Sequence, residues 1–148
     1  MSAYIPNLLL QLSIFADMSI PVAFSAYPST TTDYVTGSIV QFDVVVTNIG
    51  SSYSNDISVF QCPVNGIYLF AISLQSTLGF RMQANIIKDG SVLLSSYSDD
   101  ENNIQSSTLA VTECLASETV WVECIGDNQQ LIGDNRSSFS GVLITPVA

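Results

Sequence analysis

The chain has no histidine and very few basic residues. Three lysines and arginines stand against 13 acidic residues, so the formal net charge is −10 at pH 7 over 148 residues. Without histidine, neither a Ser-His-Asp nor a Cys-His catalytic arrangement can be built. Without a basic surface, nucleic acid is disfavoured as a partner, because phosphate binding depends on lysine and arginine. Anionic membrane surfaces are disfavoured for the same reason, and no membrane insertion is expected.

Charged residues of either sign are also scarce. They make up 11% of the chain, whereas hydrophobic residues make up 47%. The length is that of one domain, which can bury roughly 68–70% of its unfolded surface without extra crosslinks. The low charge for a domain of this size indicates that other subunits cover part of its surface.

Cysteine is present three times, as Cys62, Cys114 and Cys124. An odd number leaves at least one thiol unpaired or bonded to another chain. None of the spacings matches a zinc site. Because cysteine is among the most buried residue types, we expect buried free thiols rather than a structural disulfide.

The segment of residues 1–20 has no basic start, and its apolar run from Leu8 to Phe15 is too short to cross a bilayer. Ile5, Leu8, Leu12 and Phe15 follow alternating steps of three and four residues, and Pro6 suits the first turn of a helix. Two interpretations remain open, a signal-like segment and a short helix that joins subunits. The helix is favoured. Residues 21–148 then form the single folded domain.

From residue 20 onward the composition and the turn residues are typical of β-structure. Asp89-Gly90 predicts a tight hairpin. In one expected strand, Ile39–Thr47, alternation places Phe42, Val44 and Val46 on one face. The result is an all-β jelly-roll sandwich. The expected strands are Val22–Ala26, Ile39–Thr47, Ile57–Gln61, Gly66–Gln75, Met82–Lys88, Val92–Tyr97, Gln105–Glu113, Thr119–Ile125 and Ser138–Thr145.

The strand Gly66–Gln75 is apolar on both faces. Ile67, Leu69 and Ala71 point one way, whereas the residues between them point the other. Only one face of a strand can enter the core of a sandwich, so something else must cover the second face. A neighbouring copy of the chain is the simplest cover, and closed cyclic symmetry is its usual result. Burial of the second face by loops of the same chain is the alternative.

Several blocks of this sequence resemble the C1q globular-head family. The blocks occur in family order between residues 21 and 146. Two departures are that Ile72 stands where the signature has an aromatic residue, and that no collagen-type Gly-X-Y stalk precedes the head. The resemblance is carried by Phe42, Asn48, Tyr53, Phe60, Gly66, Tyr68 and Phe70, by Pro21–Ala26, by Cys62-Pro63-Val64, by Val120-Trp121-Val122 and by Ser138-Phe139-Ser140-Gly141.

The resemblance implies a jelly-roll homotrimer assembled around the aromatic strand, with Tyr68, Phe70 and Ile72 in the subunit interface. It also implies a secreted, extracellular protein that is not an enzyme. Invertebrate relatives without a stalk are often lectins of innate immunity, and some bind sialic acid. We therefore expect a carbohydrate-binding pattern-recognition module. The alternative is a trimeric structural or signalling ligand for a protein receptor.

Ligand groups gather in the loops expected at the end opposite the Asp89-Gly90 hairpin, since successive loops of an antiparallel sheet alternate between its ends. These loops are residues 76–81, 98–104 and 126–136, joined by 27–36. Sugar sites combine an aromatic face with carboxylate or amide groups, and a sialic carboxylate favours arginine. The candidate ligand-binding residues are Arg81, Tyr97, Asp99, Asp127, Asn128 and Arg136.

No cofactor is required by this reading, but calcium is an option. Asp99 and Asp100 are candidate metal ligands in a short oxygen-rich segment. Calcium needs about six to eight oxygens, so one loop supplies only part of a site, which three copies near a trimer axis could complete. The same region contains a sequon, Asn135-Arg136-Ser137, in an expected loop.

Overall fold

Short β-strands form the regular structure of the described residues, which are 21–97, 102 and 104–148 of a computed structural model. The segment of residues 1–20 lies outside this described part. The strands are β1 (Ala23–Tyr27), β2 (Thr32–Tyr34), β3 (Val44–Ile49), β4 (Tyr53–Ser54), β5 (Val59–Gln61), β6 (Gly66–Gln75), β7 (Ala84–Lys88), β8 (Ser91–Ser96), β9 (Gln105–Cys114), β10 (Thr119–Cys124), β11 (Gln129–Leu131) and β12 (Ser138–Pro146).

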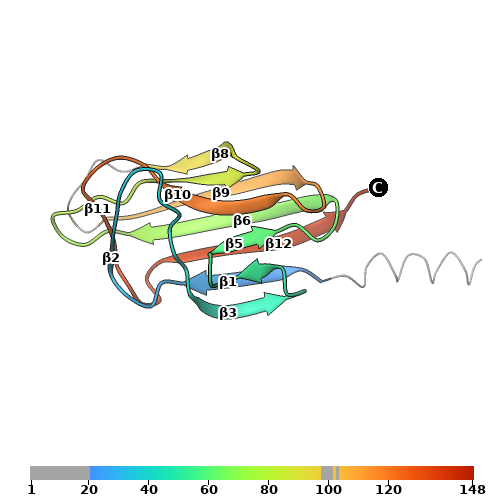
Figure 1. Cartoon of the computed structure of the whole chain (residues 1–148), viewed down its shortest axis with the longest axis horizontal. Helices are drawn as coiled ribbons and strands as arrows, with labels where there is room; N and C mark the ends of the chain where they lie inside the picture. The colour runs from blue at the N-terminus through green and yellow to red at the C-terminus, as the bar shows by residue number, and fades with distance from the viewer. Residues whose placement is uncertain (1–20, 98–101, 103) are drawn as a thin grey trace, which may run out of the picture.

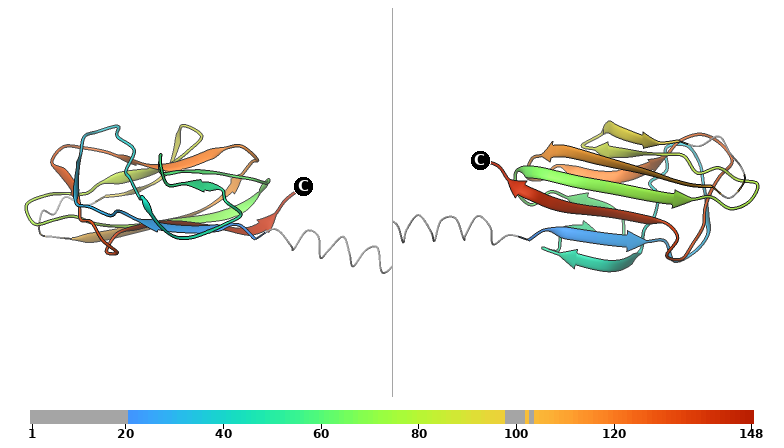
Figure 2. Two further views of the ribbon diagram at one scale, coloured as in Figure 1. Left: turned by 60° about the horizontal axis from the view of Figure 1, so that its bottom comes forward. Right: turned by 180° about the vertical axis from the view of Figure 1, so that it is seen from behind.

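Two five-stranded sheets pack face to face (Figures 1 and 2). The first sheet has the order β3-β1-β12-β6-β9, and the second has the order β4-β5-β10-β7-β8. All strand pairs within them are antiparallel. A small third sheet, β11-β2, lies at the end of the sandwich away from the C-terminus (Figure 1). The predicted all-β jelly-roll class is confirmed.

Local sequence signals placed several elements well. β6 has the predicted bounds, Gly66–Gln75. At the predicted hairpin, Lys88 pairs with Ser91, while Asp89 and Gly90 have φ angles of 48° and 86°. Asp and Gly tolerate this left-handed region, which a two-residue hairpin requires. The turn is therefore encoded locally.

The prediction of one strand over Ile39–Thr47 is wrong in its first half. β3 begins only at Val44, and the preceding residues bond to β10 of the other sheet, where the N–H of Val40 donates to the Val122 carbonyl at 2.8 Å, and to side chains. The N–H of Gln41 donates to the Tyr34 hydroxyl at 3.0 Å, and the N–H of Phe42 donates to Ser58 Oγ at 2.8 Å. The change of conformation also breaks the predicted alternation, since Phe42 is buried while Val46 is 66% exposed.

The core between the sheets is built on aromatic rings. Phe24 stacks on Tyr53 at a centroid distance of 4.6 Å and on Phe60 at 4.9 Å, and it meets Phe139 edge to face at 4.8 Å. Such pairs add stabilisation beyond their buried area. Gly141 on β12 makes room for this cluster, because an added Cβ would lie 2.5 Å from Phe24 Cε1. The phenylalanine and tyrosine residues of the family-like blocks are thus core residues.

A disulfide joins the two sheets. Cys62 follows β5 of the second sheet, Cys114 ends β9 of the first, and their Cα atoms are 6.4 Å apart. The prediction of free thiols is therefore wrong for this pair. It is correct for Cys124, which is free and buried, and whose pKa burial raises to about 11. The two bonded cysteines are 52 residues apart in sequence. Only the pairing of the sheets brings them together.

Candidate functional site

The outer face of the first sheet carries a continuous row of apolar side chains. The strand registers align Ile49, Ala23, Val142, Leu69 and Val111 across all five strands. We call these five residues the apolar row. Ile49 is 48% exposed, Val142 39% and Val111 58%. A monomer that exposes such a row on a flat sheet has an unusual surface, and contiguous apolar patches of this kind mark interaction sites.

The orientation of β6 in the same sheet shows that the prediction of the subunit-interface residues is wrong. Tyr68, Phe70 and Ile72 of β6 point into the core of their own chain and are at most 1% exposed. Tyr68 also donates a hydrogen bond to the Val64 carbonyl at 2.8 Å. A side chain sealed inside its own sandwich is not available to a neighbour. The face of β6 that is left for a partner is the one that carries Ile67, Leu69 and Ala71.

The predicted loops do meet at one end of the sandwich, which we call the loop end. It comprises residues 27–36, 76–83 and 125–137, with Asn102 beside them. Bridges join Arg81 to Gln129 and Leu78 to Asn102, and β2 pairs with β11. The sequence argument from strand polarity is confirmed in this respect. The loop end lies opposite the C-terminus (Figures 1 and 2).

Two glutamines organise the loop end, and sequence reasoning missed both. Gln129 is 2% exposed; its Oε1 accepts from the N–H of Gln83 at 2.5 Å, and its Nε2 donates to the Asp127 carbonyl at 2.7 Å. Gln130 Nε2 donates to Asp33 Oδ1 at 2.6 Å, and Gln130 Oε1 accepts from Thr77 Oγ1. In the sequence these residues are an ordinary polar pair. In the structure they tie three loops into a rigid frame.

Arg81, Asp127 and Asn128 are brought together. The N–H of Arg81 donates to the Asn128 carbonyl at 2.9 Å, and Arg81 is half-buried. Asn128 Nδ2 donates to the Gly79 carbonyl at 3.0 Å, so this amide holds the loop. Asp127 is exposed, with its main-chain carbonyl bound to Gln129. Of these three, Asp127 has the side chain most open to a ligand.

Tyr97 and Arg136 lie on other segments of the same end. Tyr97 follows β8 and is 63% exposed. Arg136 is exposed, and its carbonyl accepts from Gln105 Nε2 at 3.0 Å, beside the first sheet. The structure thus gives an exposed aromatic ring and an exposed cation. Asp99 and Asp100 lie outside the described residues, so the predicted ligand contact of Asp99 and the calcium site stay predictions.

Within residues 21–97, 102 and 104–148, no cluster of three or more acidic or cysteine side chains is arranged to hold a metal ion. Over the same residues there is no helix with the length and apolar character needed to span a membrane.

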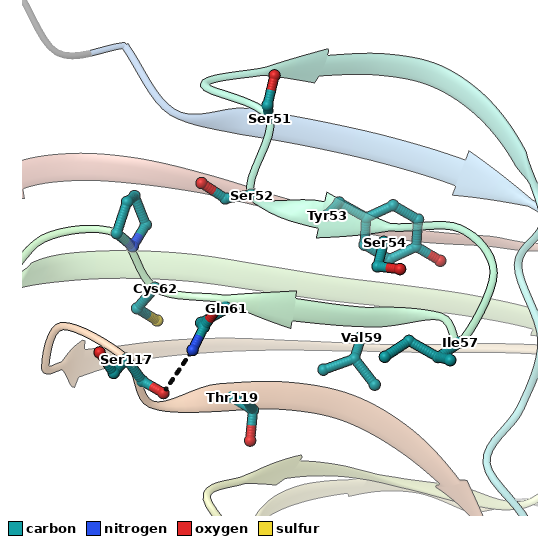
Figure 3. Close-up of a pocket in the computed structure, with 11 residues that line it drawn as sticks. Ser51, Ser52, Tyr53, Ser54, Ile57, Val59, Gln61, Cys62, Ser117 and Thr119 are labelled. Atoms are coloured by element: carbon teal, nitrogen blue, oxygen red, sulfur yellow. Dashed lines mark hydrogen bonds between the residues drawn. The ribbon is translucent and has the colours of Figure 1, made fainter.

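A groove of about 450 Å³ lies on the second sheet, away from the loop end. It runs over β4, β5 and the start of β10 (Figure 3). None of the predicted ligand-binding residues that the structure describes lines it. Its polar lining is mostly serine, from Ser51 to Ser54 on one side and Ser117 with Thr119 on the other. We call it the serine groove.

These features define a jelly-roll sandwich with an unpaired apolar sheet face and a rigid polar loop end. The model of the C1q domain matches residues 23–144. The chain therefore belongs to the C1q domain family, as the sequence resemblance implied.

Two curated relatives are similar over most of this chain. Caprin-2 of Danio rerio is 26% identical over 94% of this chain, and Multimerin-2 of Mus musculus is 28% identical over 84%. The chain spans only 16% of the first and 13% of the second. This chain is therefore similar to a single segment of each of these two larger proteins.

Solved structures show the same fold. The globular domain of zebrafish complement 1qA superposes with a TM-score of 0.73 at 20% identity, covering 86% of this chain and 99% of that one. The Eiger TNF of S. frugiperda gives 0.70 at 11%, covering 86% and 95%. Murine APRIL gives 0.66 at 12%, covering 84% and 99%. C1q- and TNF-like domains are in general binding modules and commonly form trimers.

Proposed function

We propose that the chain is an extracellular, homotrimeric recognition module that binds carbohydrate through its loop end. The apolar row is the observation that carries the assembly. It crosses all five strands of the first sheet, and most of its members are more than one-third exposed in the single chain. Burying it against a neighbour removes the exposed surface, and closed symmetry satisfies every copy in the same way.

The distribution of basic residues supports an acidic sugar as the ligand. Of the three basic side chains, Lys88 lies at the Asp89-Gly90 hairpin, away from the loop end, where its Nζ donates to the Glu113 carbonyl at 2.7 Å. The other two, Arg81 and Arg136, both belong to the loop end. The net charge of the chain is −10. An anionic ligand is therefore bound more favourably at the loop end, where both arginines lie, than elsewhere on the surface. Tyr97 adds an exposed ring on which a sugar face can stack.

Sialic acid is the ligand class that fits both features. Its carboxylate takes an arginine, because charge-assisted hydrogen bonds are the strong ones. The exposed carboxylate of Asp127 would accept hydrogen bonds from sugar hydroxyls. Calcium bound by Asp99 and Asp100 is an additional proposal. Three loop ends on one trimer would raise weak single-site binding about 10²–10⁴-fold by multivalency.

A glycan array that includes sialosides, probed with and without calcium, tests the proposal. Binding to sialosides by the wild type, with loss in Arg136→Gln, is the expected result. Silence on every glycan would reject the lectin function. The alternative, a ligand for a protein receptor, would then be favoured if the chain still bound membranes after complete deglycosylation.

A further inference from the structure

The serine groove is a second candidate site, far from the loop end. It is lined by the segment Ser51–Ser54, by Ile57, Val59, Gln61, Cys62 and Pro63, and by Ser117 and Thr119. Figure 3 shows Ser51 and Ser52 on one side of β5, Ser117 and Thr119 on the other, and Ile57 with Val59 at one end. At about 450 Å³ its volume falls within the ~300–1,000 Å³ of small-molecule sites.

The lining of the serine groove is uncharged. Only two of its residue types titrate at all, and neither is available. Cys62 is in the disulfide, and the Tyr53 hydroxyl is buried in a hydrogen bond to the Phe42 carbonyl at 2.7 Å. A charged ligand would meet no counter-charge there. Because burying an unpaired charge is costly, the uncharged lining favours a neutral ligand.

Hydrogen-bonding capacity in the groove is left unused by the protein. In the described part of the chain, the hydroxyls of Ser51, Ser54, Ser117 and Thr119 make no hydrogen bond. Ser52 and Gln61 make only long ones, at 3.2 Å to the Gly50 carbonyl and 3.4 Å to the Ser117 carbonyl. A hydroxyl both donates and accepts. This lining therefore suits a ligand that is itself rich in hydroxyls.

The walls of the groove are held firmly. Gln61 donates from its N–H to the Ser52 carbonyl at 2.9 Å, and Cys62 and Ser117 are joined through a main-chain bond of 2.8 Å. The disulfide from Cys62 anchors the same wall to the first sheet. A preformed site does not have to be ordered when the ligand binds, which preserves affinity.

We propose that the serine groove binds one residue of a neutral saccharide. Hydroxyls of the sugar would pair with the free serine and threonine hydroxyls, and its C–H face would lie on Ile57 and Val59. This site goes beyond the loop end and does not depend on it. A peptide is disfavoured because β4 is only two residues long and offers little edge for a further strand. An apolar ligand is disfavoured because the aliphatic wall is small.

Most of the groove stays accessible in the proposed trimer, and only its rim at Ser51, two residues after Ile49, adjoins the apolar row. The groove lies on the second sheet, whereas the apolar row lies on the outer face of the first. Each trimer would present three grooves on its flanks in addition to three loop ends.

Saturation-transfer NMR on the full chain tests the proposal. The probes are the methyl glycosides of glucose, galactose, mannose, N-acetylglucosamine and N-acetylgalactosamine. At least one should give a signal with the wild type. Ser54→Trp fills the groove from an exposed position and should abolish that signal. Thr119→Val removes one hydroxyl at nearly constant volume and should weaken binding roughly fivefold.

Ser91→Trp is the matched control, since Ser91 is also exposed, lies on the other edge strand of the same sheet and is outside the groove. It should bind like the wild type. Arg136→Gln separates the two sites, because it should weaken sialoside binding and keep the neutral-sugar signal. The proposal is overturned if no neutral glycoside binds, if Ser54→Trp and Thr119→Val both bind like the wild type, or if Ser91→Trp loses the signal too.

Discussion

The two sheets turn very different outer faces to their surroundings. The first sheet carries the apolar row, with valines and isoleucine exposed across its full width. The second sheet, over β4, β5 and β10, carries the uncharged hydroxyls of the serine groove. Both sheets send aromatic and aliphatic side chains into one shared core. The inner faces hold the fold together, and we propose assembly for the outer face of the first sheet and ligand binding for that of the second.

Aspartate substitutions at two similarly exposed valines, one on each sheet, test the contrast between the outer faces most directly. Val111 on β9 is 58% exposed, and Val92 on β8 is 56% exposed. Val111→Asp should place three carboxylates in the trimer interface, at a cost of several kcal/mol each, and yield monomers. Val92→Asp should remain trimeric. Sedimentation measures both masses. A trimer of Val111→Asp would place the subunit contact elsewhere.

The contrast within β6 predicts the next largest effect. Phe70 is fully buried, and Phe70→Ala should lower the free energy of unfolding by about 3–5 kcal/mol. Leu69→Ala, on the outer face, should change the stability of the separated chain much less. Urea unfolding of both variants in the Val111→Asp background compares the two faces without assembly. Equal losses would mean that the two faces of β6 are buried alike.

The contribution of the Cys62–Cys114 disulfide, which joins the two sheets, can be measured by removing it. Replacing Cys62 and Cys114 by alanine should cost about 2–4 kcal/mol, since the bridge closes a loop of 52 residues in the unfolded chain. Cys124→Ala keeps the bridge and should cost less, roughly 1–2 kcal/mol. Thermal unfolding ranks the variants. If the double variant is as stable as the wild type, the bridge contributes nothing to holding the sheets together.

The smallest expected effect is a loss of folding stability at alkaline pH. Burial raises the pKa of Tyr53 from 10.0 to about 12, against an opposing hydrogen bond. The folded chain therefore holds this proton more tightly than the unfolded chain. Its contribution, about 2 kcal/mol at most, is complete below pH 10 and is lost as the pH rises toward 12. Tyr53→Phe should flatten this part of the stability curve, which denaturation between pH 8 and 12 records.

Much of the fold could be predicted because its signals are local. Alternation in Gly66–Gln75 and the Asp89-Gly90 turn each depend on neighbours in sequence. The loop end was also predictable, since strand polarity dictates which loops share an end. The frame built by Gln129 and Gln130 was not, because its partners come from distant loops. For the same reason nothing in Ser51–Ser54 and Ser117 suggested a common groove.

The sequence by itself determined that β6 has two apolar faces, and it predicted that something other than the sandwich core covers one of them. It could not say which face, because the period of two along a strand is the same for both. The tertiary structure decided it by stacking the second sheet on Tyr68, Phe70 and Ile72. It also decided the cysteine pairing and the serine groove. Each depends on contacts between segments that only the packing of the two sheets brings into reach.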